Sequence, residues 1–238
     1  MNSIREEIIQ ANMTALAGIR TANGYNTDCG ANVERVRQVF DPDDLPAVDV
    51  WPQPDELSKE YGKNVLVMPV RISGLALFGA ENPSVVSEKI LADLIECMLG
   101  ITWSLPFTSG GTYVVQVGDV TRGDDSEATG YVTGVQVTSG SWETENAAGT
   151  LTLRRVKGQF LASETLSVGV ESNVCTVNGN MSGTEARERI FGDLVERVEY
   201  AAGGTDEYPE SGEVAVGAYA LFNITYRINA GDPYSQPS

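Results

Sequence analysis

Hydrophobic positions recur at helical spacing in two stretches of the chain and predict two amphipathic helices. The first runs from residue 4 to about residue 21, with Asn12 as a polar exception on its apolar face and Asn23-Gly24 as its stop. The second covers about residues 84–99, where Asn82-Pro83 supplies a cap and a proline at the first helical position. Each helix is expected to pack its apolar face on a sheet.

Apolar and polar residues alternate in five further stretches, as they do in strands with one buried face. Pro69 lies within the third stretch and indicates an edge strand or a bulge, because proline cannot donate to a sheet ladder. A short helical turn is expected over 184–190 and a polar loop over 203–212. The expected strands cover residues 32–40, 48–51, 64–73, 194–200 and 214–228. This order predicts an α+β fold, a mainly antiparallel sheet with the two helices on one face.

The middle of the chain, residues 102–183, has a different character. Short β-rich runs alternate there with Gly and Ser turns, which is typical of a small all-β sandwich or barrel. Trp142 and Phe160 each follow a turn and precede a strand, so we expect them to anchor the core of this domain; stacking on a sugar is the alternative. The expected strands are 113–117, 131–137, 151–153, 164–168 and 174–177. The sequence thus predicts a core domain, residues 1–101 and 184–238, that carries an inserted β-rich domain.

Composition narrows the classes of function. The 238 residues include 42% hydrophobic ones, enough for a globular core, and no window approaches the roughly 18 apolar residues of a membrane span. Arg5, Glu6 and Glu7 occupy the place of a signal peptide's apolar region, so we expect synthesis and retention in the cytosol. A net charge of −17, from 16 basic and 33 acidic residues, disfavours nucleic-acid binding over the general surface.

Few residues suggest catalysis or metal binding. The chain has no histidine, which excludes His-based triads and His-ligated metals, and its three cysteines form no CxxC pair. Neighbouring carboxylates at 43/44 and 124/125 do not provide the separation that a glycosidase needs. The acidic group Asp119, Asp124, Asp125 and Glu127 lacks the residue order of a calcium loop. We therefore expect no enzymatic activity, no metal and no cofactor.

Three segments of the predicted core domain together carry a family resemblance. They are Asn23-Gly24-Tyr25-Asn26-Thr27-Asp28, Phe40-Asp41-Pro42-Asp43-Asp44-Leu45-Pro46, and the final strand from Ile224 through Gly231-Asp232-Pro233-Tyr234. In this order, and with the strand and helix between them, they resemble tail terminator proteins of long-tailed bacteriophages. Residues 102–183 depart from the compact pattern of that family and look like β modules appended to phage structural proteins.

The resemblance implies a role in virion assembly. In the family, six copies form a ring on the last ring of the tail tube, stop its polymerisation and present the surface to which the filled head docks. The implied partners are further copies of the chain, the tail tube protein and a head-closure or neck protein, with DNA only passing through the channel and no membrane. The implied location is the tail or neck of the virion, assembled in the host cytoplasm. The candidate interface residues are Asp41, Asp43, Asp44, Tyr226, Arg227, Asp232 and Tyr234.

Two further expectations and two alternatives accompany this interpretation. Part of the negative charge is expected to line the central channel so that DNA slides without sticking. The insert is expected to project away from the stacking faces of the ring. One alternative is another neck connector, such as a head-closure or adaptor ring. The other is a tail accessory protein whose β insert binds carbohydrate.

Overall fold

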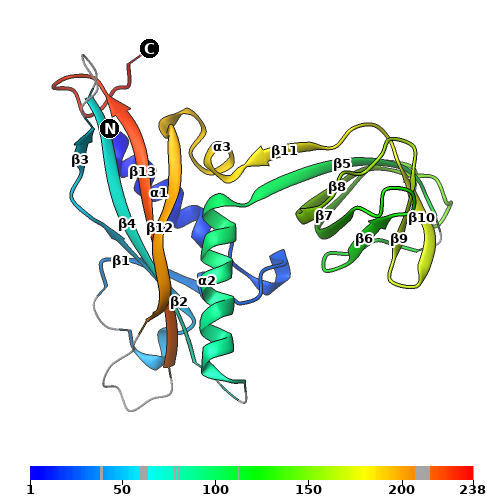
Figure 1. Cartoon of the computed structure of the whole chain (residues 1–238), viewed down its shortest axis with the longest axis horizontal. Helices are drawn as coiled ribbons and strands as arrows, with labels where there is room; N and C mark the ends of the chain where they lie inside the picture. Colours follow the sequence, from blue (N-terminus) through cyan, green and yellow to red (C-terminus); the bar gives the residue numbers. More distant parts are fainter. Residues whose placement is uncertain are drawn as a thin grey trace. The chain divides into compact units, whose positions relative to one another are not determined.

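The computed structural model describes residues 1–37, 40–58, 64–77, 79, 81–111, 113–206 and 215–237. The chain divides into two compact units (Figure 1). Unit 1 comprises Met1–Thr21, Tyr25–Leu99 and Ala186–Ser238, and unit 2 comprises Ala22–Gly24 and Gly100–Glu185. Both sheets are mainly antiparallel and the helices belong to unit 1, so the predicted α+β class is confirmed. No helix among the residues so described is long and apolar enough to cross a membrane.

Unit 1 is an open six-stranded sheet with helices on one face. Its strands run in the order β1-β2-β4-β13-β12, with β3 also paired to β4; β1 and β2 are parallel and the other neighbours antiparallel. The helices are α1 (Ile4–Leu16), α2 (Pro83–Leu99) and α3 (Ala186–Phe191). The strands are β1 (Asn32–Arg35), β2 (Ala47–Pro52), β3 (Glu56–Ser58), β4 (Asn64–Leu77), β12 (Arg197–Asp206) and β13 (Ala215–Ile228).

The core of unit 1 lies between α1, α2 and the sheet. Every second residue of β13 from Val216 to Tyr226 is buried, as the alternating pattern predicts. Ile8 and Leu16 of α1 and Ile90 of α2 pack in the same cluster and are fully buried. The second helix is confirmed at its start, where Asn82 Oδ1 accepts a hydrogen bond from the Ser84 N–H (3.0 Å).

The first helix is shorter than predicted. It ends at Leu16, and the N–H groups of Gly18 and Ile19 bond to carbonyls only three residues back, which tightens the backbone into a turn. Ile19 is nevertheless fully buried. Because Ile19 is apolar, the helical pattern in the sequence continues past Leu16, where the helix ends. The described residues include four short 3-10 turns, η1 (Thr21–Asn23), η2 (Cys29–Ala31), η3 (Pro42–Asp44) and η4 (Gly192–Leu194).

The edge prediction made from Pro69 is wrong. β4 is a central strand, because β13 pairs along its whole length and β2 and β3 share its other side. Pro69 fits there because its carbonyl faces the gap between β2 and β3, accepting from the Gln53 N–H, so the missing N–H of Pro69 interrupts no ladder. β13 is also central, between β4 and β12, and β12 forms the edge on that side of the sheet.

Other boundaries of unit 1 also move. β1 ends at Arg35 because Val36 has a φ of 56° and turns the chain; residues 38 and 39 of the predicted strand lie outside the described part. The first part of the expected loop 203–212 is strand as far as residue 206, and residues 207–214 are not described. The expected strand 194–200 begins only at Arg197, since Leu194 ends a 3-10 turn. The expected turn at 184–190 is α3, which starts two residues later.

Unit 2 is a closed barrel. β10 pairs with both β9 and β5, so β5, β8, β7, β6, β9 and β10 close on themselves, and β11 extends the sheet beside β5. Its strands are β5 (Ile101–Gly110), β6 (Val120–Gly123), β7 (Thr129–Ser139), β8 (Ala147–Lys157), β9 (Thr165–Val168), β10 (Glu171–Val177) and β11 (Ser182–Glu185). The barrel is filled by apolar side chains, among them Leu105, Phe107, Leu151 and Leu166.

The strand expected at 113–117 does not form. Asp119 accepts hydrogen bonds from the Tyr113 hydroxyl (3.1 Å) and from the Gln116 N–H (2.8 Å), which folds this segment into a turn. Val115 still points into the barrel core. Side-chain acceptance by one aspartate therefore overrides the β-propensity of this tyrosine- and valine-rich run.

Candidate assembly surface

The exit of the first helix is held by a buried aspartate. Asp93 of α2 is fully buried and accepts four hydrogen bonds, from the N–H and side-chain amide of Asn26 (3.0 and 2.7 Å) and from the N–H and hydroxyl of Thr27 (both 2.8 Å). Burial raises the pKa of Asp93, and these hydrogen bonds oppose the rise. Asp28 in turn accepts from the Thr21 N–H (2.7 Å). The first segment of the resemblance thus has a defined structural role.

The acidic loop after β1 presents two free-standing carboxylates. Asp41 and Asp43 are exposed, whereas Asp44 is half-buried in an ion pair with Arg37 (2.5 Å). The Arg37 guanidinium also lies over the ring of Phe40, 5.0 Å from its centroid. The carboxylates of Asp41 and Asp43 are therefore the ones this loop can offer to a partner.

A second buried aspartate holds this loop to the sheet. Asp49 of β2 is 4% exposed and accepts from the Arg37 N–H (3.1 Å) and from the indole N–H of Trp51. Burial raises the pKa of Asp49, and the hydrogen bonds to it act in the opposite direction. Asp49 thereby fixes where the acidic loop leaves the sheet.

Tyr226, a predicted interface residue, belongs to the core instead. It is 1% exposed, and its hydroxyl donates to Asp55 Oδ2 (2.9 Å), which also pairs with Arg5 of α1 (3.2 Å). Burial, followed by the neighbouring Asp55 charge, raises the pKa of the phenol. The alternation of β13 turns Tyr226 toward the helices, so its side chain is not on the surface. Arg227, its neighbour, points to the other face and pairs with Glu196.

The C-terminal Gly-Asp-Pro segment forms a turn against the first helix. The Pro233 carbonyl accepts from the Ile4 N–H (2.9 Å), one of the N–H groups at the helix start that has no partner within the helix. Asp232 is exposed and accepts from the Ser235 hydroxyl (2.6 Å) and the Tyr234 N–H (3.0 Å), which lower the pKa of its carboxyl. The Tyr234 side chain is 53% exposed.

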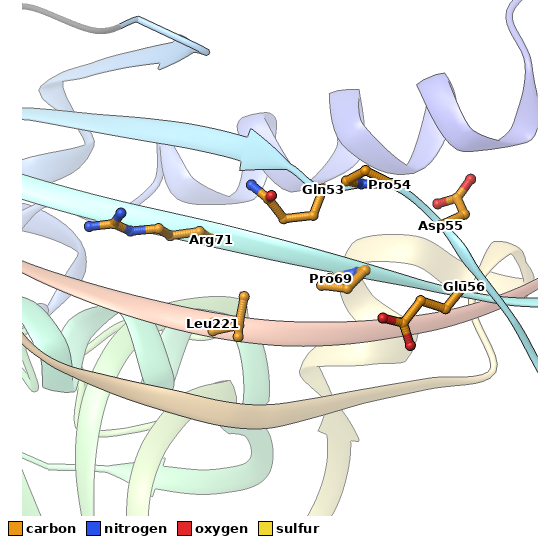
Figure 2. A pocket seen from close by; sticks show the side chains of 7 residues that line it. All are labelled: Gln53, Pro54, Asp55, Glu56, Pro69, Arg71 and Leu221. Carbon is orange, nitrogen blue, oxygen red and sulfur yellow. The ribbon is translucent and has the colours of Figure 1, made fainter.

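A groove of about 550 Å³ opens where β2 gives way to β3 (Figure 2). Pro69, Arg71 and Leu221 lie on the sheet face opposite the helices, because they alternate with the buried Val70 and Ile72 or pair across from them. The Arg71 guanidinium stacks over Tyr219, 4.8 Å from the ring centroid. The lining residues are Gln53, Pro54, Asp55, Glu56, Pro69, Arg71 and Leu221. This mixture of one cation, two carboxylates and apolar floor suits a protein contact.

The sheet of unit 1 ends in an unpaired strand, β12. It is ten residues long and pairs with β13 on one side only among the strands described. Sequence reasoning missed this edge because Gly203 and Gly204 were assigned to a loop. Asp93 and Asp49 were missed as well; for Asp93 the signal was an acidic residue between the buried Ile90 and Leu94 of an amphipathic helix.

In unit 2 the two expected aromatic anchors lie at the core. Phe160 is 3% exposed, and the half-buried Trp142 stacks on Phe107 with ring centroids 5.3 Å apart. Trp142 also covers Gly110, where an added Cβ would lie 2.8 Å from its ring. Neither aromatic ring is presented as an open platform for a sugar.

The acidic group of unit 2 makes separate contacts. Asp119 holds the 113–116 turn, and Asp124 accepts from the hydroxyls of Thr165 and Ser167 (both 2.5 Å). Glu127 pairs with Arg122 (2.9 Å). Within the described ranges no group of three or more His, Cys, Asp or Glu side chains could hold a metal ion.

The three cysteines form no disulfide and are buried. Burial raises the pKa of both Cys29 and Cys175 to about 12, so these thiols stay protonated and unreactive at neutral pH.

No protein-family model matches the chain, and no curated protein matches it significantly. The acidic loop after β1, the groove beside β3 and the open edge of β12 thus belong to one sheet.

Proposed function

We propose that the chain is an assembly protein of the tail terminator type, which forms a ring at the head-proximal end of a phage tail tube. One observation carries the proposal: each of the three segments that bear the resemblance is anchored to unit 1, the first through residues 26–28, since Ala22–Gly24 belong to unit 2. Asp93 holds the first, Asp49 holds the base of the second, and the Pro233 carbonyl joins the third to α1. Unit 1 is thus a candidate for the family's core domain.

The proposed ring uses the open architecture of unit 1. Sheet edges and a groove allow a copy to contact the next through different surfaces, and a cyclic arrangement of such contacts limits itself in number. Such a ring, proposed to contain six copies, would contact the tail tube protein on one face and a head-closure or neck protein on the other. DNA would only pass through the channel, which part of the −17 net charge would line.

Electron microscopy of the purified protein mixed with tail tubes tests the proposal. Rings at the head-proximal tube end, together with a halt in tube growth, are expected. Rings that bind only on the portal side would favour the alternative of a head-closure or adaptor ring. No ring and no tube binding would overturn the proposal.

A charge-reversal pair tests the acidic loop within this function. Asp41→Lys together with Asp43→Lys is expected to reduce tube capping at least tenfold if the loop faces the tube protein. Glu143→Lys with Glu145→Lys is the matched control, because it reverses two exposed charges in the β7–β8 hairpin of unit 2. Equal capping by both double variants would remove the loop from the interface.

We further propose that unit 2 is a peripheral module of this protein, outside the ring contacts. Its first and last strands meet, since Ile101 pairs with Glu185, so the whole barrel can be replaced by a short linker. A variant lacking residues 103–182 is expected to form rings and cap tubes. Loss of ring formation in a variant that remains folded would contradict the peripheral role.

A further inference from the structure

β12 carries few of the features that keep an edge strand from pairing. Natural edges are usually short, charged, bulged, covered or broken by proline. β12 spans Arg197–Asp206, has no proline, and has charged residues only at 197, 199 and 206. The six residues 200–205 between them are uncharged, and the only irregularity is a bulge between Tyr200 and Ala202.

The pairing with β13 defines which face each β12 residue occupies. Tyr200 pairs with the buried Phe222 and Gly203 with the buried Ala220, so both are on the helix-covered face. Thr205 is on that face as well, because its hydroxyl accepts from Ser87 of α2 (3.0 Å). The bulge at Ala201 shifts the alternation by one residue. Residues 198, 200, 203 and 205 therefore share the helix-covered face, and 197, 199, 202 and 204 share the open face; Asp206 takes the next register position, across from Gly217.

We propose that the β12 edge pairs with β12 of a second copy of this chain, antiparallel and about a two-fold axis between Ala201 and Ala202. In this register every residue meets one on the same face of the extended sheet. The bulge makes this possible, because without it each residue would face a residue whose side chain lies on the opposite face of the sheet. The proposed cross-strand pairs are Arg197 with Asp206, Val198 with Thr205, Glu199 with Gly204, and Tyr200 with Gly203.

Each proposed pair is complementary in charge, shape or size. Arg197 meets an acidic residue, and two β-branched residues meet one position further in. The large Tyr200 and Glu199 each meet a glycine, and aromatic residues stabilise glycines across a sheet. Tyr200 is 39% exposed and lies edge-on to Phe222, with centroids 5.9 Å apart. A Cβ at Gly203 would lie 2.5 Å from the Tyr200 hydroxyl, so only glycine leaves room for tyrosine rings beside the axis.

A second copy fits this edge better than an unrelated strand because the edge matches itself. Two copies of one ten-residue segment satisfy charge, shape and face at once, which an arbitrary strand would meet only by chance. The contact is isologous, so it uses the same edge of both copies and stops at two. The inference concerns the free protein and does not depend on the proposed ring; the pair would cover the β12 edge in solution.

Charge exchange on the full-length chain tests the pairing. Sedimentation equilibrium is expected to show a reversible dimer for the unaltered protein. Arg197→Asp alone and Asp206→Arg alone should each weaken the dimer about tenfold, because both symmetry-related pairs become like-charged. The double variant Arg197→Asp with Asp206→Arg should recover dimerisation, since the opposite charges again meet. Arg122→Asp, at an exposed ion pair of unit 2, is the matched control and should change nothing.

Hydrogen exchange supplies an independent readout. Amides of β12 are expected to gain protection as the protein concentration rises through the dimer transition, while amides of the barrel strands do not. A protein that stays monomeric, single variants without effect, or a double variant no better than the single ones would each overturn the pairing. Tube capping by Arg197→Asp is measured separately: capping without dimerisation leaves the ring intact as a proposal, and dimerisation without capping leaves the pairing intact.

Discussion

Unit 1 and unit 2 are both antiparallel β structures, but they treat the ends of their sheets in opposite ways. In unit 2 the sheet returns to β5 through β10, so the barrel strands have neighbours on both sides. In unit 1 the sheet stops at β12 on one side and at β1 and β3 on the other. Only unpaired strand edges can add a further strand. In unit 2 the described strand with a single neighbour is the four-residue β11, so association through main-chain pairing is expected from the ten-residue β12 edge of unit 1 and not from the closed barrel.

In both units a buried carboxylate holds a segment of irregular backbone by accepting hydrogen bonds. In unit 1 Asp93 accepts four hydrogen bonds from residues 26 and 27, and in unit 2 Glu164 accepts four from residues 125, 126 and 161. Both carboxylates are buried, at 0% and 2% exposure. Each carboxylate therefore accepts hydrogen bonds from loop N–H groups that, in a strand, would bond to the neighbouring strand.

Emptying one core position in each unit is the strongest test of their independence. Phe222→Ala removes a fully buried ring on the helix-covered face of β13. Phe107→Ala removes a buried ring of β5 in the barrel, on which Trp142 stacks. Each is expected to lower the free energy of unfolding of its own unit by about 4 kcal/mol. Hydrogen exchange resolved by segment measures this. If either substitution exposes amides of both units equally, the two units unfold as one and the comparison fails.

Removing the buried carboxylates is expected to have the next largest effect. Asp93→Ala leaves four donors of unit 1 without an acceptor, and Glu164→Ala does the same in unit 2, so each should cost about 3 kcal/mol. Denaturant unfolding of each variant measures the loss. Asp193→Ala, at an exposed position, is the control and should stay within about 0.5 kcal/mol of the unaltered protein. A loss of similar size in the control would show that the buried carboxylates hold nothing special.

The Tyr226 hydroxyl allows a smaller and more local test within unit 1. Tyr226→Phe removes its hydrogen bond to Asp55 while keeping the ring, and is expected to cost about 1 kcal/mol in unfolding free energy. Tyr234→Phe changes an exposed tyrosine of the same unit and should be neutral. Thermal unfolding of the two variants side by side decides the point. Equal stability would mean that Asp55 gains nothing from Tyr226 beyond its pairing with Arg5.

Periodic elements with clear caps could be predicted closely from the sequence. α2 begins within one residue of its expected start because Asn82 and Pro83 mark it, and the buried face of β13 follows its strict alternation from residue 216 to 226. The changes of character at residues 102 and 183 lie near the unit borders at 100 and 185. In these places local propensity and burial agree.

Other features depend on contacts that no local pattern records. The sequence predicts part of β12 as loop because Gly203 and Gly204 have no side chains that could show an alternating pattern, although both residues pair with β13. Pro69 wrongly indicates an edge strand because the gap between β2 and β3, where its missing N–H does no harm, is a property of the sheet and not of the β4 sequence. Of the candidate interface residues, Asp41, Asp43, Asp232 and Tyr234 are exposed, while the side chain of Tyr226 faces the core because of its register.

Lowering the pH is expected to change the stability contributions of one aspartate in each unit in opposite directions. Burial raises the pKa of Asp49 in unit 1, so its contribution to stability is present below the ordinary aspartate pKa and is lost as pH rises through the raised value. Hydrogen bonds from Ser167 and Thr165 lower the pKa of Asp124 in unit 2, so its contribution is present at neutral pH and is lost only as pH falls through the lowered value.

Two asparagine variants measure these opposite slopes. Unfolding is followed by denaturant at high dilution between about pH 8 and about pH 3, since the sequence pI is near 4.3. On acidification the unaltered protein should gain stability relative to Asp49→Asn and lose it relative to Asp124→Asn. Slopes of the same sign for both variants would contradict the assignment. Opposite slopes would show that hydrogen bonds from hydroxyl groups stabilise the charged form of Asp124 in unit 2. They would also show that burial disfavours the charged form of Asp49 in unit 1.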